Sequence, residues 1–139
     1  MVTSQQAKEW LNRNYGMWKQ LKSLKHRRAS QTFANISNYE QGFSEVTGNA
    51  TEEKMADFAE LNRRIEALEQ RLAAGDSETM AVIDKVETPV YWSVLRDRYI
   101  ERKGWRQIAK SYCYSERHVY REHGRALNEV RKFIPEEEL

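Results

Sequence analysis

Apolar residues recur at steps of three and four along most of this chain, the spacing of helices that bury one face. A first helix is predicted over 3–28, on a stripe made of Ala7, Trp10, Asn14, Met17, Leu21 and Leu24. A second is predicted over 52–74, on a heptad seam made of Phe58, Leu61, Ile65, Leu68 and Leu72, which Met55 extends. Together the two predicted helices indicate a coiled-coil-like helical hairpin. Alternatively, the heptad seam joins two copies of the chain, and both can be true in a dimeric bundle.

Two stretches interrupt this pattern. Residues 30–51 keep no helical period and are rich in Ser, Thr, Asn and Gly, so we predict a long loop with one short helical turn near 38–43. Gly75, followed by Asp76 and Ser77, favours a break or kink before a short helix that carries Met80, Ile83 and Val86. One bent helix that continues through Gly75 is the alternative.

Three further helices are predicted in the last third of the chain. Thr88 and Pro89 indicate the start of the first, because proline fits the first helical turn. The second is expected over 105–111, where Ile108 and Ala109 can pack against the third. A tight turn separates the second helix from the third, for which Ser115 is the expected N-cap.

The third of these helices has two distinct faces at about 100° per residue. Its inner face carries His123 and the apolar residues Val119, Ala126 and Val130, with Leu127 and Ile134 beside them. The opposite face carries Arg117, Arg121, Arg125 and Gly124, flanked by Tyr120 and His118. This pattern favours a helix-turn-helix whose last helix enters a DNA groove.

Charge follows the same division. Residues 1–30 hold seven Lys/Arg and one acidic residue. Residues 31–87 hold five Lys/Arg and twelve acidic residues, and residues 88–139 hold eleven Lys/Arg and eight acidic residues. Because Glu136, Glu137 and Glu138 belong to the last group, the predicted DNA-binding part is more basic without them. The predicted domains are a scaffold or oligomerisation part over 1–87, a trihelical module over 88–134 and a frayed acidic tail over 135–139.

Composition excludes several classes of protein. Cys113 is the only cysteine, and no apolar run approaches the length of a membrane span. No basic-then-apolar signal pattern opens the chain. The sequence also lacks zinc-ligand spacing, a Gly-rich phosphate loop and a nucleophile with its base. We therefore expect an all-α cytoplasmic protein without catalytic residues, cofactor or metal that is not an enzyme.

The run LRDRYIERKGWRQIAKSYCYSERHVYREHGRALNEV, over 95–130, resembles a known kind of module. The matching residues are Leu95 with Arg98-Tyr99-Ile100, Trp105 with Ile108-Ala109, Tyr114-Ser115-Glu116-Arg117, and His123-Gly124-Arg125-Ala126-Leu127. The run is similar to the DNA-binding fourth region of bacterial sigma factors. It is more similar still to small phage regulators of late transcription, the ArpU/RinA-like group. Glu122 departs from that pattern, since an apolar residue is usual there, and so does the turn Tyr112-Cys113-Tyr114.

The resemblance implies a phage-encoded, sequence-specific regulator that binds double-stranded DNA and activates late genes with the host RNA polymerase. The expected base contacts are Glu116, Arg117, His118, Tyr120 and Arg121. The expected phosphate contacts are Lys103, Arg106, Lys110, Ser115 and Arg125. A homo-oligomer through helices 4–28 and 52–74 is expected. A packaging protein of the small-terminase kind and a polymerase-binding interaction protein remain as alternatives.

Overall fold

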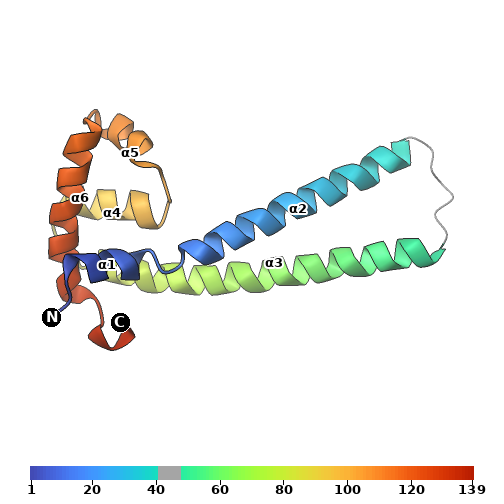
Figure 1. The fold of residues 1–139 in the computed structure, drawn as a ribbon, viewed down its shortest axis with the longest axis horizontal. Coiled ribbons are helices and arrows are strands. Elements are labelled where there is room, and N and C mark those ends of the chain that lie inside the picture. The colour runs from blue at the N-terminus through green and yellow to red at the C-terminus, as the bar shows by residue number, and fades with distance from the viewer. Residues whose placement is uncertain (41–47) are drawn as a thin grey trace. The chain divides into compact units, whose positions relative to one another are not determined.

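The computed structural model describes the backbone of residues 1–40 and 48–139 and the side chains of residues 1–32 and 52–139. Within these ranges the fold is all-helical, as predicted, and contains no strand. The helices are α1 (Ser4–Leu11), α2 (Tyr15–Glu40), α3 (Gly48–Ile83), α4 (Pro89–Tyr99), α5 (Trp105–Tyr112), α6 (Glu116–Val130), and the short 3-10 helices η1 (Arg131–Phe133) and η2 (Glu136–Glu138) (Figure 1). None of the helices described combines the length and the apolar character that a bilayer span requires.

The chain forms two compact units. One consists of residues 15–73, and the other of residues 1–14 together with 74–139. This division differs from the predicted boundary after residue 87, because both the first helix and the end of α3 pack with the C-terminal helices. The boundary between the units falls inside α3.

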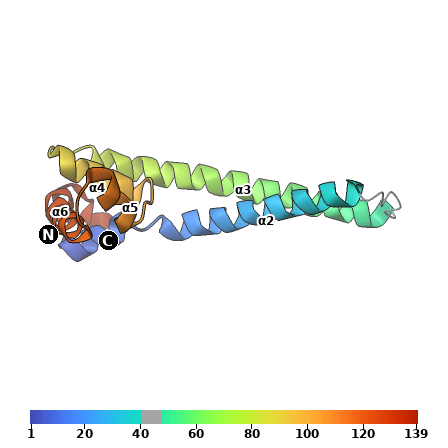
Figure 2. The same ribbon diagram turned by 90° about the horizontal axis from the view of Figure 1, so that it is seen from above.

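In the unit of residues 15–73, α2 and the first part of α3 run antiparallel, side by side (Figure 2). Their shared buried residues are Leu21, Leu61, Ile65, Leu68 and Leu72, with Met17, Trp18 and Leu24 partly buried against them. The seam of α3 therefore matches the heptad prediction from Leu61 onward. Met55 does not extend it, because its side chain is 67% exposed.

The predicted loop over 30–51 is wrong wherever the structure describes that stretch. Helix α2 continues to Glu40, and α3 already begins at Gly48. Once a helix is nucleated, each added residue closes one more backbone hydrogen bond, so polar residues without a periodic pattern can still extend it. The predicted short turn near 38–43 falls partly in the end of α2 and partly on residues 41–43, which lie outside the described residues.

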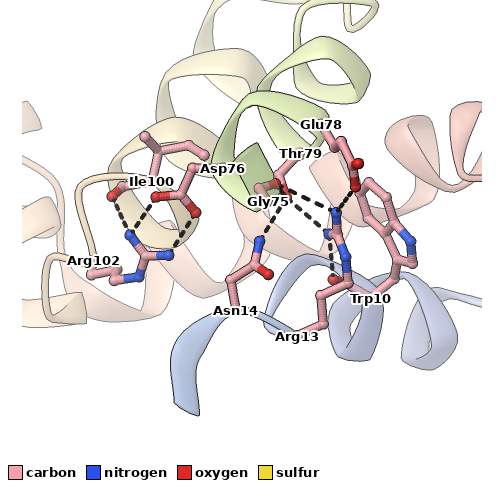
Figure 3. A network of polar contacts seen from close by, with 9 residues as sticks. All are labelled: Trp10, Arg13, Asn14, Gly75, Asp76, Glu78, Thr79, Ile100 and Arg102. Carbon is pink, nitrogen blue, oxygen red and sulfur yellow. Dashed lines mark hydrogen bonds and ion pairs between the residues drawn. The ribbon is translucent and has the colours of Figure 1, made fainter. Parts of the chain in front are cut away.

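The single first helix predicted over 3–28 is also wrong, because α1 ends at Leu11 and α2 begins at Tyr15. The interruption contains Asn12 and Asn14, and asparagine side chains compete with the helix for backbone hydrogen bonds. The side chain of Asn14 is buried and reaches Thr79 of α3, with 3.4 Å between its Nδ2 and the hydroxyl oxygen (Figure 3). The break therefore turns a polar side chain inward.

Helix α3 runs unbroken through Gly75, so the predicted break there is wrong. A Cβ atom placed on Gly75 would lie 2.6 Å from Oδ1 of Asn14 (Figure 3). Such a distance is shorter than real carbon–oxygen contacts. The glycine is therefore explained by the close approach of the Asn14 side chain and not by a turn.

Replacing Gly75 with alanine is expected to destabilise the protein by about 1–2 kcal/mol. Alanine favours a helix by about 1 kcal/mol over glycine, but here its methyl group would displace the buried Asn14 side chain, and overpacking costs about 1–3 kcal/mol. The measurement is urea unfolding. Gly124→Ala is the matched control, since no atom lies within 4 Å of a Cβ at that exposed helical position. It should stabilise, and stabilisation by both variants would contradict this account of Gly75.

The unit of residues 1–14 and 74–139 has its own core, which α1, the end of α3, α4 and α6 share. Its buried residues are Val2, Ala7, Trp10, Leu11, Val82, Ile83, Val86, Leu95, Tyr99, Ala126, Leu127, Val130 and Ile134. The acidic tail was predicted to be frayed, but in the structure it contacts this unit. The indole Nε1 of Trp10 donates to Glu138 at 2.8 Å, and the N-terminal amino group lies 3.2 Å from Glu136.

Candidate nucleic-acid interface

Helices α5 and α6 are joined by a turn of three residues that is stabilised at both ends. Cys113 closes α5 in the left-handed conformation at φ 56°, and the amide of Tyr114 donates to the carbonyl of Ala109 at 2.9 Å. At the other end the hydroxyl of Ser115 accepts from the amide of His118 at 3.1 Å. The predicted N-cap is confirmed, and the turn forms without the glycine that usually takes this backbone conformation.

A small apolar cluster holds the two helices together. Ile108 and Ala109 of α5 and Val119 of α6 are buried, and the side chains of Trp105, Tyr112 and Tyr114 pack around them. The predicted contact between α5 and α6 is therefore confirmed. Because Val119 faces this cluster and Val130 faces the larger core, the rotation of α6 about its own axis is fixed.

Helix α4 supports α6 from its inner side. The hydroxyl of Tyr99 lies 2.7 Å from Nε2 of His123, and the ring of Trp105 meets the His123 ring edge-on at 4.6 Å between centroids. The guanidinium of Arg98 lies over the ring of Trp105, 4.4 Å from the ring centroid. His123 therefore lies on the inner face, as predicted.

The contact between Tyr99 and His123 joins two neutral groups. Burial is the main cause that lowers the pKa of His123 to about 4, and the positive charges of Lys8 and Arg98 add to it. Burial also raises the pKa of Tyr99. At neutral pH the pair therefore packs behind α6 without a buried charge.

The faces of α5 and α6 that point away from their shared apolar cluster carry four exposed cations. They are Arg106 and Lys110 on α5 and Arg117 and Arg121 on α6. Within the described part of the chain, none of these four side chains has an ion pair or a hydrogen bond. A cationic side chain without an internal partner keeps its donors for an external one, so these exposed faces suit an anionic ligand.

The other predicted base contacts differ in how available they are. Tyr120 is 48% exposed, with its ring 5.2 Å from that of Trp105, and Glu116 is exposed in the first turn of α6. His118 is only partly exposed. Its ring stacks on Tyr114 at 4.0 Å between centroids, and its Nε2 lies 3.4 Å from Glu122.

Three of the predicted phosphate contacts are already engaged within the protein. Lys103 lies 3.6 Å from Asp97, Arg125 lies 3.1 Å from Glu122, and the Ser115 hydroxyl caps α6. Only Arg106 and Lys110 of that group are without partners in the described residues. Spacing therefore places the cations of α5 and α6 on the exposed face of each helix, but it did not lead us to separate the paired ones from the unpaired ones.

Glu122 is the residue of this site whose role sequence reasoning missed. It occupies a position that is apolar in the resembling proteins, and its side chain is only 11% exposed. It contacts His118 one turn before it and Arg125 almost one turn after it. The signal was present in the spacing, since residues three and four apart are neighbours on a helix surface.

The described side chains form no group of three or more His, Cys, Asp or Glu residues that could hold a metal ion, and Cys113 is a free, exposed thiol. What distinguishes the site is a helix packed along its inner face whose Arg117 and Arg121 have no partner among the described residues. Comparison with protein-family models, with curated proteins and with solved structures found no match to this chain.

Proposed function

We propose that this protein is a sequence-specific regulator of transcription that binds double-stranded DNA. In this proposal α5 and α6 are a helix-turn-helix of the sigma region-4 kind, α4 completes the trihelical module, and α6 is the recognition helix. The observation that carries the proposal is that Arg117 and Arg121 are exposed and unpaired on α6, whose opposite face is fully buried.

The positions of the two arginines suit the reading of bases. They lie one helical turn apart in the first half of α6, the part of a recognition helix that meets base edges in the major groove. A guanidinium can donate to both acceptors of guanine at once, which discriminates by about 1–3 kcal/mol. Tyr120 and Glu116 are exposed beside them and are the next candidates for base contacts.

The cations of α5 suit a different role. Arg106 and Lys110 lie one turn apart on the preceding helix, which in helix-turn-helix proteins crosses the DNA backbone. Contacts to phosphate fix the position of the protein without reading sequence. Lys103, Arg125 and His118 first have to give up a contact inside the protein, so we expect them to contribute less.

The resemblance to late-transcription regulators adds the biological setting to this proposal. We propose a phage-encoded activator of late genes that works with the host RNA polymerase. Selection of genomic fragments by the purified protein tests this setting. One enriched site beside late genes supports it, whereas enrichment at a packaging start would favour the small-terminase alternative. Polymerase capture that survives nuclease treatment, without any DNA enrichment, would favour the interaction-protein alternative.

Arg117→Ala and Arg121→Ala are each expected to weaken binding to the selected site by roughly tenfold or more, because each removes a contact to a base edge. Arg106→Ala should instead weaken binding to all sequences alike and lower the slope of log affinity against log salt by about one. Fluorescence anisotropy with a labelled duplex measures both effects across a salt series.

Lys85→Ala and Lys132→Ala are the matched controls for these arginine variants. Both lysines are exposed in the same unit and lie outside α5 and α6. Their removal should leave affinity nearly unchanged. Wild-type affinity in folded Arg117→Ala and Arg121→Ala proteins would show that α6 is not the recognition helix.

A further inference from the structure

One side of α2 combines aromatic rings with ammonium groups. The ring centroids of Tyr15 and Trp18 lie 5.7 Å apart. Lys19 Nζ lies 5.6 Å from the centroid of the Tyr15 ring, and Lys22 Nζ lies 5.1 Å from the centroid of the Trp18 ring. With His26 these residues line a shallow hollow, and Tyr15 is 41% exposed. A surface that is both apolar and cationic suits a partner that is itself apolar and acidic.

Helix α3 supplies surface of that complementary kind. Residues 15–28 of α2 hold five Lys/Arg and no acidic residue, whereas residues 52–69 of α3 hold six acidic residues and three basic ones. Among the described side chains, only Lys25 and Glu69 form an ion pair between the two helices, at 4.0 Å. Within α3, Glu60 pairs with Arg63 and Arg64, whereas Glu66 forms no ion pair with any described residue.

The Lys25–Glu69 contact identifies the flank on which these charges gather. Lys22 precedes Lys25 by three residues, and Glu66 precedes Glu69 by three, so each is a surface neighbour of that contact. At 100° per residue Lys22 and Glu66 lie on the same flank of the α2–α3 pair, and neither has an ion pair within the described residues. This flank is thus basic and aromatic along α2 and acidic along α3.

We infer that this flank is a docking surface for a second copy of the chain. A twofold axis along the helices places α2 of one copy on α3 of the other, so that the basic flank of α2 lies over the acidic flank of α3 twice. A twofold axis across the helices would instead place lysines against lysines. The charges therefore select the first arrangement. This specifies the homo-oligomer that the sequence suggested and restricts it to α2 and α3.

The small apolar core of residues 15–73 also favours association with a second copy of the chain. The α2–α3 pair buries only Leu21, Leu61, Ile65, Leu68 and Leu72 among its described residues, a single seam between two helices. Such a pair has little core of its own, and a second pair adds a further apolar interface around Trp18 and Tyr15. The inference is independent of the proposed function, because none of the cations on the outer side of α5 and α6 belongs to this unit.

The test is the mass of the full-length protein in sedimentation equilibrium over a range of concentrations. The wild type is expected to be a dimer. Lys22→Glu and Glu66→Lys should each raise the dimer dissociation constant at least tenfold, because each brings like charges onto facing flanks of the two copies twice. An equimolar mixture of the two variants should dimerise again, since in that heterodimer each changed flank faces a flank of opposite charge.

Gln20→Glu is the control, since it also introduces a glutamate into α2, but on the other flank, and should leave the dimer intact. Recovery in the mixture also shows that both variants are folded. A wild type that is monomeric, or larger than a dimer, at all concentrations would overturn the inference. So would a dimer that neither variant weakens, or a mixture that remains monomeric. A monomeric protein in which Lys22→Glu weakens DNA binding would assign this flank to nucleic acid instead.

Discussion

Replacing Asp76 with alanine is expected to destabilise the unit of residues 1–14 and 74–139 by about 3 kcal/mol. The two carboxylate oxygens of Asp76 accept from the Arg102 guanidinium at 2.7 and 3.0 Å (Figure 3). The side chains of Arg102 and Asp76 are only 7% and 22% exposed. Removing one partner of a buried ion pair leaves the other buried charge less compensated, and breaking such pairs costs about 3–5 kcal/mol. Because Asp76 is partly exposed, we expect a loss of stability at the lower end of this range.

The backbone at Arg102 gives this pair a second role. Arg102 lies in the connection between α4 and α5 with φ at 56°, the left-handed region that costs a non-glycine residue about 1 kcal/mol or more. Its guanidinium also donates to the carbonyl of Ile100 at 2.9 Å. The ion pair therefore holds a strained loop against the end of α3, directly before the α5–α6 pair.

Urea unfolding measures the effect, followed by tryptophan fluorescence, because Trp10, Trp92 and Trp105 all belong to this unit. Glu78→Ala is the matched control. Glu78 lies two residues from Asp76 and pairs with Arg13 at 3.3 Å, but its side chain is 68% exposed. Exposed pairs contribute about 0–1 kcal/mol. Equal losses in the two variants would contradict the burial argument.

Periodicity predicted the parts of this fold that depend on spacing within one helix. Val119, Ala126 and Val130 are buried because residues at these intervals share one face, wherever the helix lies in the molecule. The same reasoning failed at Gly75. Helix propensity is a local property, whereas Asn14, which occupies the space beside this glycine, comes from a distant part of the sequence.

In the candidate site, too, spacing within one helix predicted the direction of side chains but not all of their partners. The outward direction of Arg117 and Arg121 was predictable from the inward direction of Val119, since these residues lie on one helix. The contact of Arg125 with Glu122 also follows from spacing within that helix. The partner of Lys103 does not: it pairs with Asp97 of α4 because the strained loop before α5 folds back, and spacing along the sequence does not reveal such a fold. Loop conformation thus helps to decide which cations remain available to an external ligand.

The second large effect is a loss of stability in acid that originates at His123. Burial lowers the pKa of this side chain to about 4, against 6.5 for the unperturbed group. The unfolded chain therefore binds a proton below about pH 6.5, while the folded chain does not bind it until about pH 4. Between these values the unfolded state takes up more protons, so stability rises with pH.

The contribution of His123 is complete above about pH 6.5 and is lost as the pH falls towards 4. The difference of the two pKa values corresponds to a loss of about 3 kcal/mol. Urea unfolding at pH 7.0, 5.5 and 4.5 tests this. His123→Gln, which keeps a hydrogen-bonding group for Tyr99 but does not titrate, should be less stable at pH 7 and should depend less on pH. Parallel pH profiles for the two proteins would assign the acid loss to other groups. Because His123 joins α6 to Tyr99 of α4, its protonation would also loosen the support behind Arg117 and Arg121, and the proposed DNA binding should weaken over the same pH range.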